Sequence, residues 1–294
     1  MRFMARQNQS NNLLNVLKPL EGVIKGNLTV EQKNILRDAV NLRVFSPALS
    51  DNLILILGCQ RSGTTLALLM LQAHPQIQGI DETEFPSPFP FPSSIALYSH
   101  QLQKKSICLK LPEHIFNVEY IARHFPKVKI LWIVRNPYST ISSMSALKNT
   151  QGSWIKRCGA TELRRFIPFF PEIKQLDFDS LDEISLGAMV WKYKNQALEI
   201  YQEKGLQVFN FRYEDLIDNS QNMMSDILKF LDLPWSDRVL EYYKFHQPNK
   251  TYPGNTKGDR AIDSSRKSSK PKLTESEQNT IRSIAEDLII QYGY

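Results

Sequence analysis

The residues best suited to chemistry stand in a short loop after an apolar run. Residues 53–57 are apolar, residues 58–65 are Gly-Cys-Gln-Arg-Ser-Gly-Thr-Thr, and residues 66–73 are again mostly apolar. This order predicts a strand, a glycine loop and a helix, the context of a phosphate-binding loop. Small residues let successive backbone N–H groups turn toward one anion, and the helix aims its positive end at the same point. The alternative, a glycine turn before a core helix, is disfavoured by the full order of segments.

One residue type separates this loop from the Walker A pattern. Gly58 and Gly63 have the Gly-x-x-x-x-Gly spacing, but Thr64 stands where the pattern has lysine. The cation of the loop is Arg61 instead, and Thr64 and Thr65 add hydroxyl donors. Because that lysine is a principal electrostatic element of phosphoryl transfer, the loop disfavours a kinase or ATPase.

A second candidate anion site begins where the apolar run 127–134 ends. Arg135 follows that run, and the next residues, Asn136 and Pro137, are typical of a helix start. Open α/β sheets bind ligands at the carboxyl ends of their strands, so Arg135 and the helical hydroxyl of Ser143 could clamp a second phosphate. An arginine at a strand end is more often a surface ion pair; the pairing with the first loop favours a binding role.

Five apolar segments, with amphipathic segments between them, predict the scaffold that positions these loops. They span residues 53–57, 77–80, 107–111, 128–134 and 206–211. Near-continuous apolar runs are typical of parallel strands buried on both faces. We therefore expect an α/β fold: a single P-loop-like domain with a central parallel sheet flanked by helices.

The remaining segments complete the expected domain organisation. Residues 11–25 and 30–43 show helical spacing. We therefore expect residues 1–50 to form a helical N-terminal extension packed on the core, followed by the main domain, residues 51–294. Residues 86–92 carry proline at every second position, which predicts a stiff loop. Residues 273–290 predict a closing helix.

Composition excludes several classes of protein. The 294 residues are 42% hydrophobic and 22% charged, which are ordinary globular values and exclude a disordered, collagen-like or coiled-coil chain. Three cysteines are too few for a disulfide framework. Since no secretory signal and no apolar run of about 18 residues is present, we expect a cytoplasmic protein with no membrane partner.

Most of the net charge of +6 lies in one segment. Residues 250–272 hold seven basic and two acidic residues, so they contribute +5 and the rest of the chain is nearly neutral. This distribution favours a small anion enclosed by a local loop and disfavours a broad nucleic-acid-binding face. The alternative is a solvated basic linker.

The two anion sites resemble those of sulfotransferases, which use 3′-phosphoadenosine 5′-phosphosulfate (PAPS). Residues 61–66 resemble the family's 5′-phosphosulfate loop, and residues 133–137 with Ser143 resemble its 3′-phosphate site. The chain is more narrowly similar to the tyrosylprotein sulfotransferase branch, in collinear order from residue 52 to 245. Further matching stretches are 61–82, 108–112, 213–216 and 228–235.

The resemblance implies that PAPS is the cofactor, with PAP as its product and no metal. The residues that would hold the 5′-phosphosulfate are Arg61, Ser62, Gly63, Thr64 and Thr65. Arg135 and Ser143 would hold the 3′-phosphate, and Tyr213 would lie near the nucleotide. The region matching 250–272 closes over the cofactor in the family. We therefore expect a basic lid, whose contacts would be Ser264, Arg266 and Lys267.

The resemblance also implies the catalytic residues. Glu82 falls where the tyrosylprotein branch has its catalytic carboxylate, and Lys110 where it has a lysine facing the transferred group. Sulfuryl transfer needs a base for the acceptor's proton and cations for the charge that develops on the leaving group. Glu82 would be that base, with Arg61 and Lys110 as the cations. A histidine base would be His100 or His114, each more typical of an ordinary surface or core histidine.

Two departures from the tyrosylprotein branch bear on the acceptor. The branch has Glu-Thr-Arg where this chain has Glu82-Thr83-Glu84. The branch also carries a membrane anchor, which we do not expect in this protein. The acidic turn leads to the hypothesis of a small-molecule acceptor, such as a cationic metabolite of secondary metabolism. The alternative is a solvated acidic turn.

Three other functions remain open at this point. They are a protein-tyrosine sulfotransferase, a kinase with a degenerate phosphate loop, and a nucleic-acid-binding protein supported only by the charge of residues 250–272. The sequence leaves the oligomeric state open.

Overall fold

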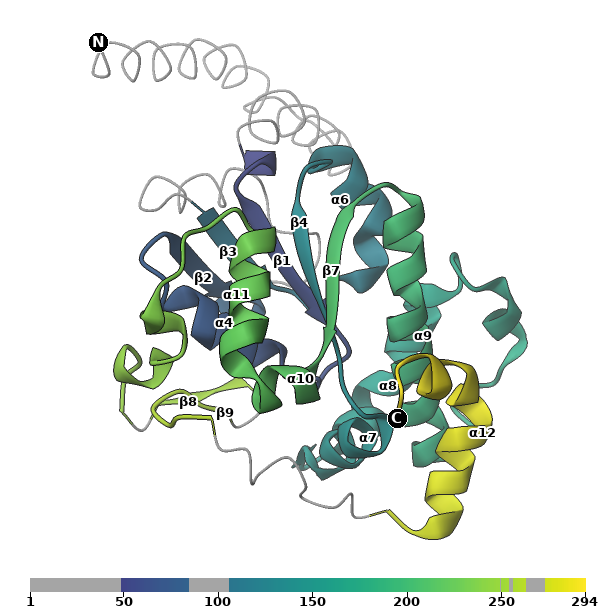
Figure 1. The fold of residues 1–294 in the computed structure, drawn as a ribbon. Helices are drawn as coiled ribbons and strands as arrows, with labels where there is room; N and C mark the ends of the chain where they lie inside the picture. The colour runs from purple at the N-terminus through teal and green to yellow at the C-terminus, as the bar shows by residue number, and fades with distance from the viewer. Residues whose placement is uncertain (1–48, 85–105, 249, 254–255, 263–272) are drawn as a thin grey trace, which may run out of the picture.

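The computed structural model describes residues 49–84, 106–248, 250–253, 256–262 and 273–294 (Figure 1). Several expectations lie outside these residues. They are the helical extension up to residue 48, the proline-rich loop 86–92, His100, and the expected lid contacts Ser264, Arg266 and Lys267. Over the described ranges, no helix combines the length and apolar character needed to cross a bilayer.

A five-stranded parallel sheet forms the centre of the domain (Figure 1). Its order is β2 (Ile77–Asp81), β3 (Ser106–Lys110), β1 (Leu53–Gly58), β4 (Lys129–Val134) and β7 (Gln207–Arg212). Every neighbouring pair is parallel. All five apolar segments are strands, so the predicted α/β fold with a central parallel sheet is confirmed.

Alternate residues of each strand supply two separate cores. Leu53, Leu55 and Leu57 of β1 point into one core, whereas Ile54 and Ile56 point into the other. This alternation follows from the two-residue period of a strand. Because helices cover both faces of the sheet, the residues of a strand such as β1 are apolar on both sides, which gives continuous apolar runs in the sequence.

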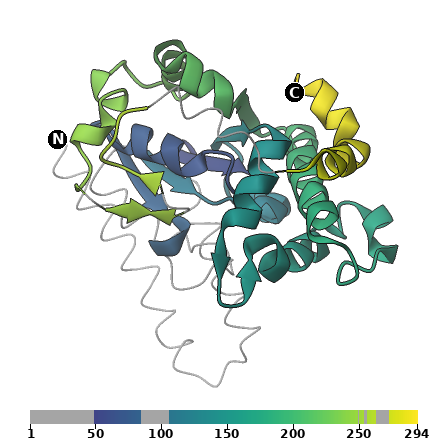
Figure 2. The same cartoon turned by 90° about the horizontal axis from the view of Figure 1, so that it is seen from below.

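Helices cover the two faces in two layers (Figures 1 and 2). One core packs against α4 (Thr64–Gln72), α10 (Tyr213–Asp218) and α11 (Ser220–Phe230). The other packs against α6 (Val118–His124), α7 (Pro137–Ala146), α8 (Trp154–Phe166), α9 (Glu183–Glu203) and α12 (Glu275–Gln291). The predicted closing helix is α12, which lies against α9 at the edge of the molecule.

Two small hairpins lie beside the main sheet. One pairs β5 (Lys148–Asn149) with β6 (Gly152–Ser153), and the other pairs β8 (Thr251–Tyr252) with β9 (Thr256–Lys257). The second lies below the carboxyl edge of the sheet, beside α4 (Figures 1 and 2). There the Thr65 hydroxyl donates to the carbonyl oxygen of Pro253, 3.4 Å away.

The start of α7 confirms the helix signal that follows Arg135. The Asn136 side chain accepts a hydrogen bond from the Ser139 backbone N–H at 3.1 Å, and Pro137 is the first helical residue. Arg135 is thereby held between the end of β4 and a capped helix. Since parallel strands end at one edge of the sheet, the segments after β1, β2, β3, β4 and β7 all meet there.

Gly58 ends β1 where the chain passes closest to β4. Its φ is +142°, and a Cβ atom would lie 2.4 Å from the Ile133 carbonyl oxygen. We expect Gly58→Ala to lower the free energy of unfolding by about 2 kcal/mol or more, from backbone strain and overpacking together. Urea denaturation measures this loss.

Gly205→Ala is the matched control for backbone strain alone. Gly205 has a φ of +72°, and nothing lies within 4 Å of the Cβ position. Gly205→Ala should lower the free energy of unfolding by about 1 kcal/mol. An equal loss of unfolding free energy in the two variants would contradict a steric clash between a side chain at residue 58 and β4.

Candidate active site

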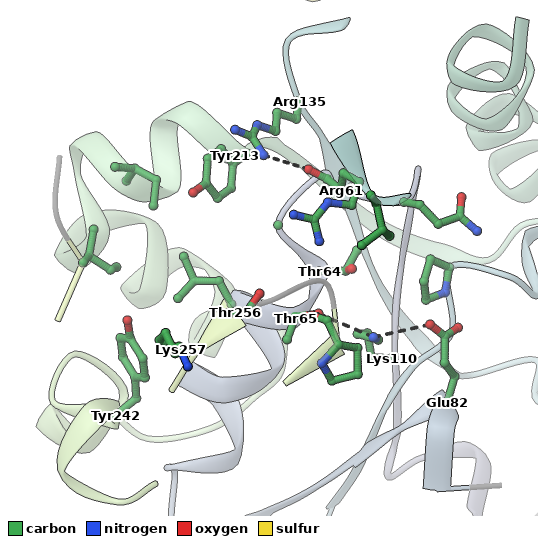
Figure 3. Close-up of a pocket in the computed structure, with 18 of the residues that line it drawn as sticks. Arg61, Thr64, Thr65, Glu82, Lys110, Arg135, Tyr213, Tyr242, Thr256 and Lys257 are labelled. Atoms are coloured by element: carbon green, nitrogen blue, oxygen red, sulfur yellow. Dashed lines mark hydrogen bonds and ion pairs between the residues drawn. The ribbon is translucent and has the colours of Figure 1, made fainter. Parts of the chain in front are cut away.

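A cavity of about 490 Å³ opens at the carboxyl edge of the sheet (Figure 3). Its walls include the loop after β1, the turn after β2, the end of β3, the loop after β4, the start of α10, and residues 253, 256–257 and 260–262. Glu82 and Lys110 lie at one end of the pocket, and Tyr242 and Lys257 lie at the other. Arg135 and Tyr213 lie above them, with Arg61 in between.

The phosphate-type loop takes a conformation that glycine makes possible. Gly63 has a φ of +94° and immediately precedes α4. A Cβ atom at Gly63 would lie 2.2 Å from Cδ2 of Tyr213, so any side chain there would displace the Tyr213 ring. Arg61 also has a positive φ, +70°, which is uncommon for a residue other than glycine. The loop thus presents Arg61, Thr64 and Thr65 to the cavity.

Two arginines lie together at the upper side of the pocket. Nη1 of Arg135 donates to the Arg61 carbonyl oxygen at 2.9 Å, and Nε of Arg61 donates to Oγ of Ser143 at 2.9 Å. The Arg135 guanidinium lies 4.6 Å from the centre of the Tyr213 ring. Burial and the positive charge of Arg135 lower the pKa of Arg61. Two neighbouring cations in a partly buried site favour a multiply charged anion.

Lys110 supplies a cation near the position that lacks the Walker lysine. It ends β3, the strand next to β1, and its Nζ lies 3.5 Å from Oγ1 of Thr65. The same Nζ is 2.7 Å from Oδ2 of Asp81 and 3.4 Å from Oε1 of Glu82. The Lys110 side chain is only 3% exposed, so these two carboxylates and the loop determine where its charge lies.

Glu82 has the properties of a group that exchanges a proton near neutral pH. Burial raises its pKa to about 7, with further increases from the charges of Glu113 and Asp81, whereas Lys110 opposes the shift. Oε2 of Glu82 is buried and has no hydrogen-bond partner among the described residues. A carboxyl group with such a pKa is suited to general base chemistry.

Two expected site residues, Ser62 and Ser143, are not among the residues that line the cavity. Ser62 is fully buried, and its hydroxyl has no hydrogen-bond partner within the described ranges. Ser143 contacts the site through Arg61. The described part of the chain otherwise places Arg61, Gly63, Thr64, Thr65, Glu82, Lys110, Arg135 and Tyr213 around one cavity.

His114 has the environment of a core histidine. It is 1% exposed, and burial with the nearby charges of Arg165 and Lys194 lowers its pKa to about 4. Its Nδ1 is 2.9 Å from Nδ2 of Asn117, and its ring stacks on Phe116. Nothing in these contacts favours it as the base.

Several wall residues were not singled out from the sequence. They are Glu113, Ile217, Tyr242, Lys257 and Arg260. Lys257 and Arg260 belong to the basic segment 250–272, but that run has no spacing that distinguishes one cation from the next. The Tyr242 hydroxyl donates to the Arg260 carbonyl oxygen at 2.7 Å, which holds the segment against the pocket. Only the tertiary contacts identify these two cations.

A metal centre has no support among the described residues. No group of three or more His, Cys, Asp or Glu side chains within those ranges is placed to bind an ion. The charged residues that line the cavity are the cations Arg61, Lys110, Arg135, Lys257 and Arg260 and the carboxylates Glu82 and Glu113.

Comparison with curated proteins connects this site to known enzymes. A protein-tyrosine sulfotransferase of Drosophila melanogaster is 28% identical over 251 residues, covering 71% of this chain and 44% of the fly protein. An omega-hydroxy-beta-dihydromenaquinone-9 sulfotransferase of Mycobacterium bovis is 26% identical over 159 residues, covering 51% of this chain and 35% of that protein. The aligned part of the chain thus spans about half or less of these relatives.

Solved structures show the same fold. The sulfotransferase domain from the curacin biosynthetic pathway has a TM-score of 0.55 at 19% identity, covering 80% of this chain and 96% of that one. A mouse sulfotransferase complexed with PAP has a TM-score of 0.50 at 15% identity, covering 83% and 88%. The family model described as the sulfotransferase family matches residues 53–92 and 90–237. Since this match spans more than half of its length, the chain belongs to the sulfotransferase family.

Proposed function

We propose that this protein transfers the sulfuryl group of PAPS to a hydroxyl or amine of a small-molecule acceptor. The observation that carries the proposal is the content of one pocket. Arg61, Arg135 and Lys110 approach it from three different strand ends, and Glu82, a carboxyl group with a pKa of about 7, lies beside Lys110. Anion-binding cations next to a proton acceptor are what sulfuryl transfer requires.

The pocket residues fit a nucleotide with phosphate groups at both ends. Nε of Arg135 is buried without a hydrogen-bond partner among the described residues, so it retains a donor for a 3′-phosphate. Arg61, Thr64 and Thr65, with the backbone at Gly63, would hold the 5′-phosphosulfate at the start of α4. Tyr213 would lie beside the nucleotide. Ser62 and Ser143 would act by shaping the loop and orienting Arg61.

The chain's own residues would then divide the chemistry between them. Bound PAPS supplies the sulfuryl group and leaves as PAP. Oε2 of Glu82 would take the proton of the acceptor, because it is ionised above its pKa and has no competing partner among the described residues. Lys110 and Arg61 would stabilise the negative charge that develops on the leaving phosphate side.

We also propose that the acceptor is a small cationic metabolite of secondary metabolism. The charges of Asp81 and Glu113 act on Glu82, and Glu82 and Glu113 line the pocket. Such a cluster attracts an ammonium or guanidinium group. Two relatives are named for different acceptors, a protein tyrosine and a hydroxylated dihydromenaquinone, so kinship alone does not select one. The three free cysteines support a cytoplasmic location.

The segment 250–272 is proposed to act as a basic lid over the nucleotide. Its described part supports this proposal, because Lys257 and Arg260 belong to the pocket wall. Nζ of Lys257 donates to Oγ1 of Thr251 at 2.7 Å, across the β8–β9 hairpin. Ser264, Arg266 and Lys267 remain proposed contacts.

Calorimetry with PAP, ATP and an oligonucleotide tests the donor assignment. PAP should bind more tightly than ATP, and the oligonucleotide should not bind, since only PAP offers phosphates that match both arginine sites. Arg135→Ala should weaken PAP binding by about 10- to 100-fold, the worth of a charged hydrogen bond. Arg164→Ala, which removes an exposed arginine paired with Asp179, is the control and should leave PAP affinity unchanged. ATP binding as tight as PAP binding would favour the kinase alternative.

Glu82→Gln tests the assignment of the base. It should lower kcat by about 10²- to 10⁴-fold and keep the affinity for PAP, because the amide cannot accept the acceptor's proton. Glu113→Gln is the matched control, which should mainly raise KM for cationic acceptors. Turnover with labelled PAPS, over a panel of amines, guanidines and acidic tyrosine peptides, measures both. Full turnover by Glu82→Gln would refute the assignment, and a preference for the peptides would refute the cationic acceptor.

The pH dependence of kcat/KM provides an independent test. Glu82 is protonated below its raised pKa and cannot then act as a base. Activity should therefore rise about tenfold per pH unit up to about pH 7 and level off above it. The residual activity of Glu82→Gln should lack this rise. A wild-type profile that stays level from pH 5 to pH 8 would contradict Glu82 as the titrating base.

A further inference from the structure

A buried ion pair lies directly behind the phosphate-type loop and has no part in the proposed chemistry. It joins Lys194 of α9 to Glu162 of α8, and the two side chains are 1% and 6% exposed. Removing two charges from water is costly, and such pairs can often be replaced by apolar residues without loss of stability. A contribution to stability therefore does not explain why the pair is there.

The contacts of Lys194 reach two segments that line the active pocket. Besides Glu162, its Nζ donates to Oε1 of Gln60 at 2.6 Å and to the Pro112 carbonyl oxygen at 2.9 Å. Three acceptors match the three donors of an ammonium group. Gln60 also donates to Oε2 of Glu162 at 3.5 Å, and Nη1 of Arg165 lies 2.7 Å from Oε1 of Glu162. All three donors of Lys194 are thus paired, and Glu162 is shared between Lys194 and Arg165.

The two segments that Lys194 joins carry two of the proposed catalytic cations. Gln60 immediately precedes Arg61 in the loop, and Pro112 lies two residues after Lys110. The β1–β3 ladder ends in this region, with Ile56 paired to Lys110 and the Leu111 N–H donating to the Ile56 carbonyl oxygen at 3.0 Å. Beyond the Leu111–Ile56 hydrogen bond, Lys194 connects the two segments by binding Gln60 in one and Pro112 in the other.

We propose that Lys194, held by Glu162, is a positioning residue that sets the spacing between Arg61 and Lys110. The proposal rests on the proposed function, since this spacing matters only if the two cations act on one transferred group. Misplacement of a catalytic group by about 1 Å can cost on the order of 100-fold in rate. The phosphates of PAP would be held by Arg135, Thr64, Thr65 and the loop backbone as well as by Arg61. The contacts of Lys194, with Glu162, Gln60 and Pro112, include none of these groups.

The double variant Lys194→Met/Glu162→Gln tests the proposal without leaving a lone buried charge. Its readouts are the rate of labelled sulfate release from saturating PAPS, with water as acceptor, the Kd for PAP, and the melting temperature. We expect the rate to fall about 100-fold and the Kd for PAP to stay within about threefold. Gln60→Met removes the contact between Lys194 and the loop and keeps the ion pair. It should also lower the rate while leaving the Kd for PAP nearly unchanged, so it tests the proposal even if the double variant misfolds.

Lys192→Met/Asp287→Asn is the matched control. It removes an ion pair of 3.1 Å from the same helix, α9, on the side that faces α12. Both its rate and its PAP affinity should equal those of the wild type. An unchanged rate in the Lys194 and Gln60 variants would overturn the proposal, as would equal losses of rate, affinity and thermal stability. A wild-type protein that does not bind PAP would instead refute the proposed function, and the inference with it.

Discussion

The structure depends on keeping two guanidinium groups close together at the edge of a parallel sheet. Arg61 and Arg135 come from the ends of adjacent strands, and hydrogen bonds to a carbonyl oxygen and to the Ser143 hydroxyl hold them in place. Their mutual repulsion is greater in a partly buried site than in water. An anion between them removes this cost, so the arrangement selects for a ligand with closely spaced negative charges. Gly63 allows it, because only a residue without Cβ leaves room for the Tyr213 ring.

Positively and negatively charged groups lie on different sides of the pocket. The arginines and the start of α4 make one side positive, whereas Asp81 and Glu82 surround Lys110 at the other end. Burial keeps the Glu82 carboxyl group close to its protonation midpoint at neutral pH. In the proposed reaction, the positive side would bind the anionic donor and Glu82, beside Lys110, would take the acceptor's proton. The buried Lys194 joins the loop that carries Arg61 to the segment that follows Lys110.

Much of the fold could be predicted because the strands are buried on both faces. Continuous apolar runs such as 53–57 and 128–134 mark such strands without any tertiary information, and their positions agree with the observed strands to within about a residue at most ends. The N-cap of α7 was predictable for a similar reason, since Asn136 and Pro137 act on their own backbone. Residues with less local signal were missed. Glu113, Lys257 and Arg260 enter the pocket wall only because their segments fold back against the sheet edge.

The sequence by itself determined the parallel sheet, the glycine loop and the capped helix after Arg135, and through resemblance it proposed Glu82 and Lys110 as catalytic residues. These features are encoded locally, in apolar periodicity, glycine spacing and capping residues. The tertiary structure alone decided how the charges act on one another. Lys110 lies beside Thr65 because β3 is the neighbour of β1, and the pKa of Glu82 rises because its surroundings exclude water. Distance and burial between segments far apart in the chain set these properties, and no local pattern in the sequence records them.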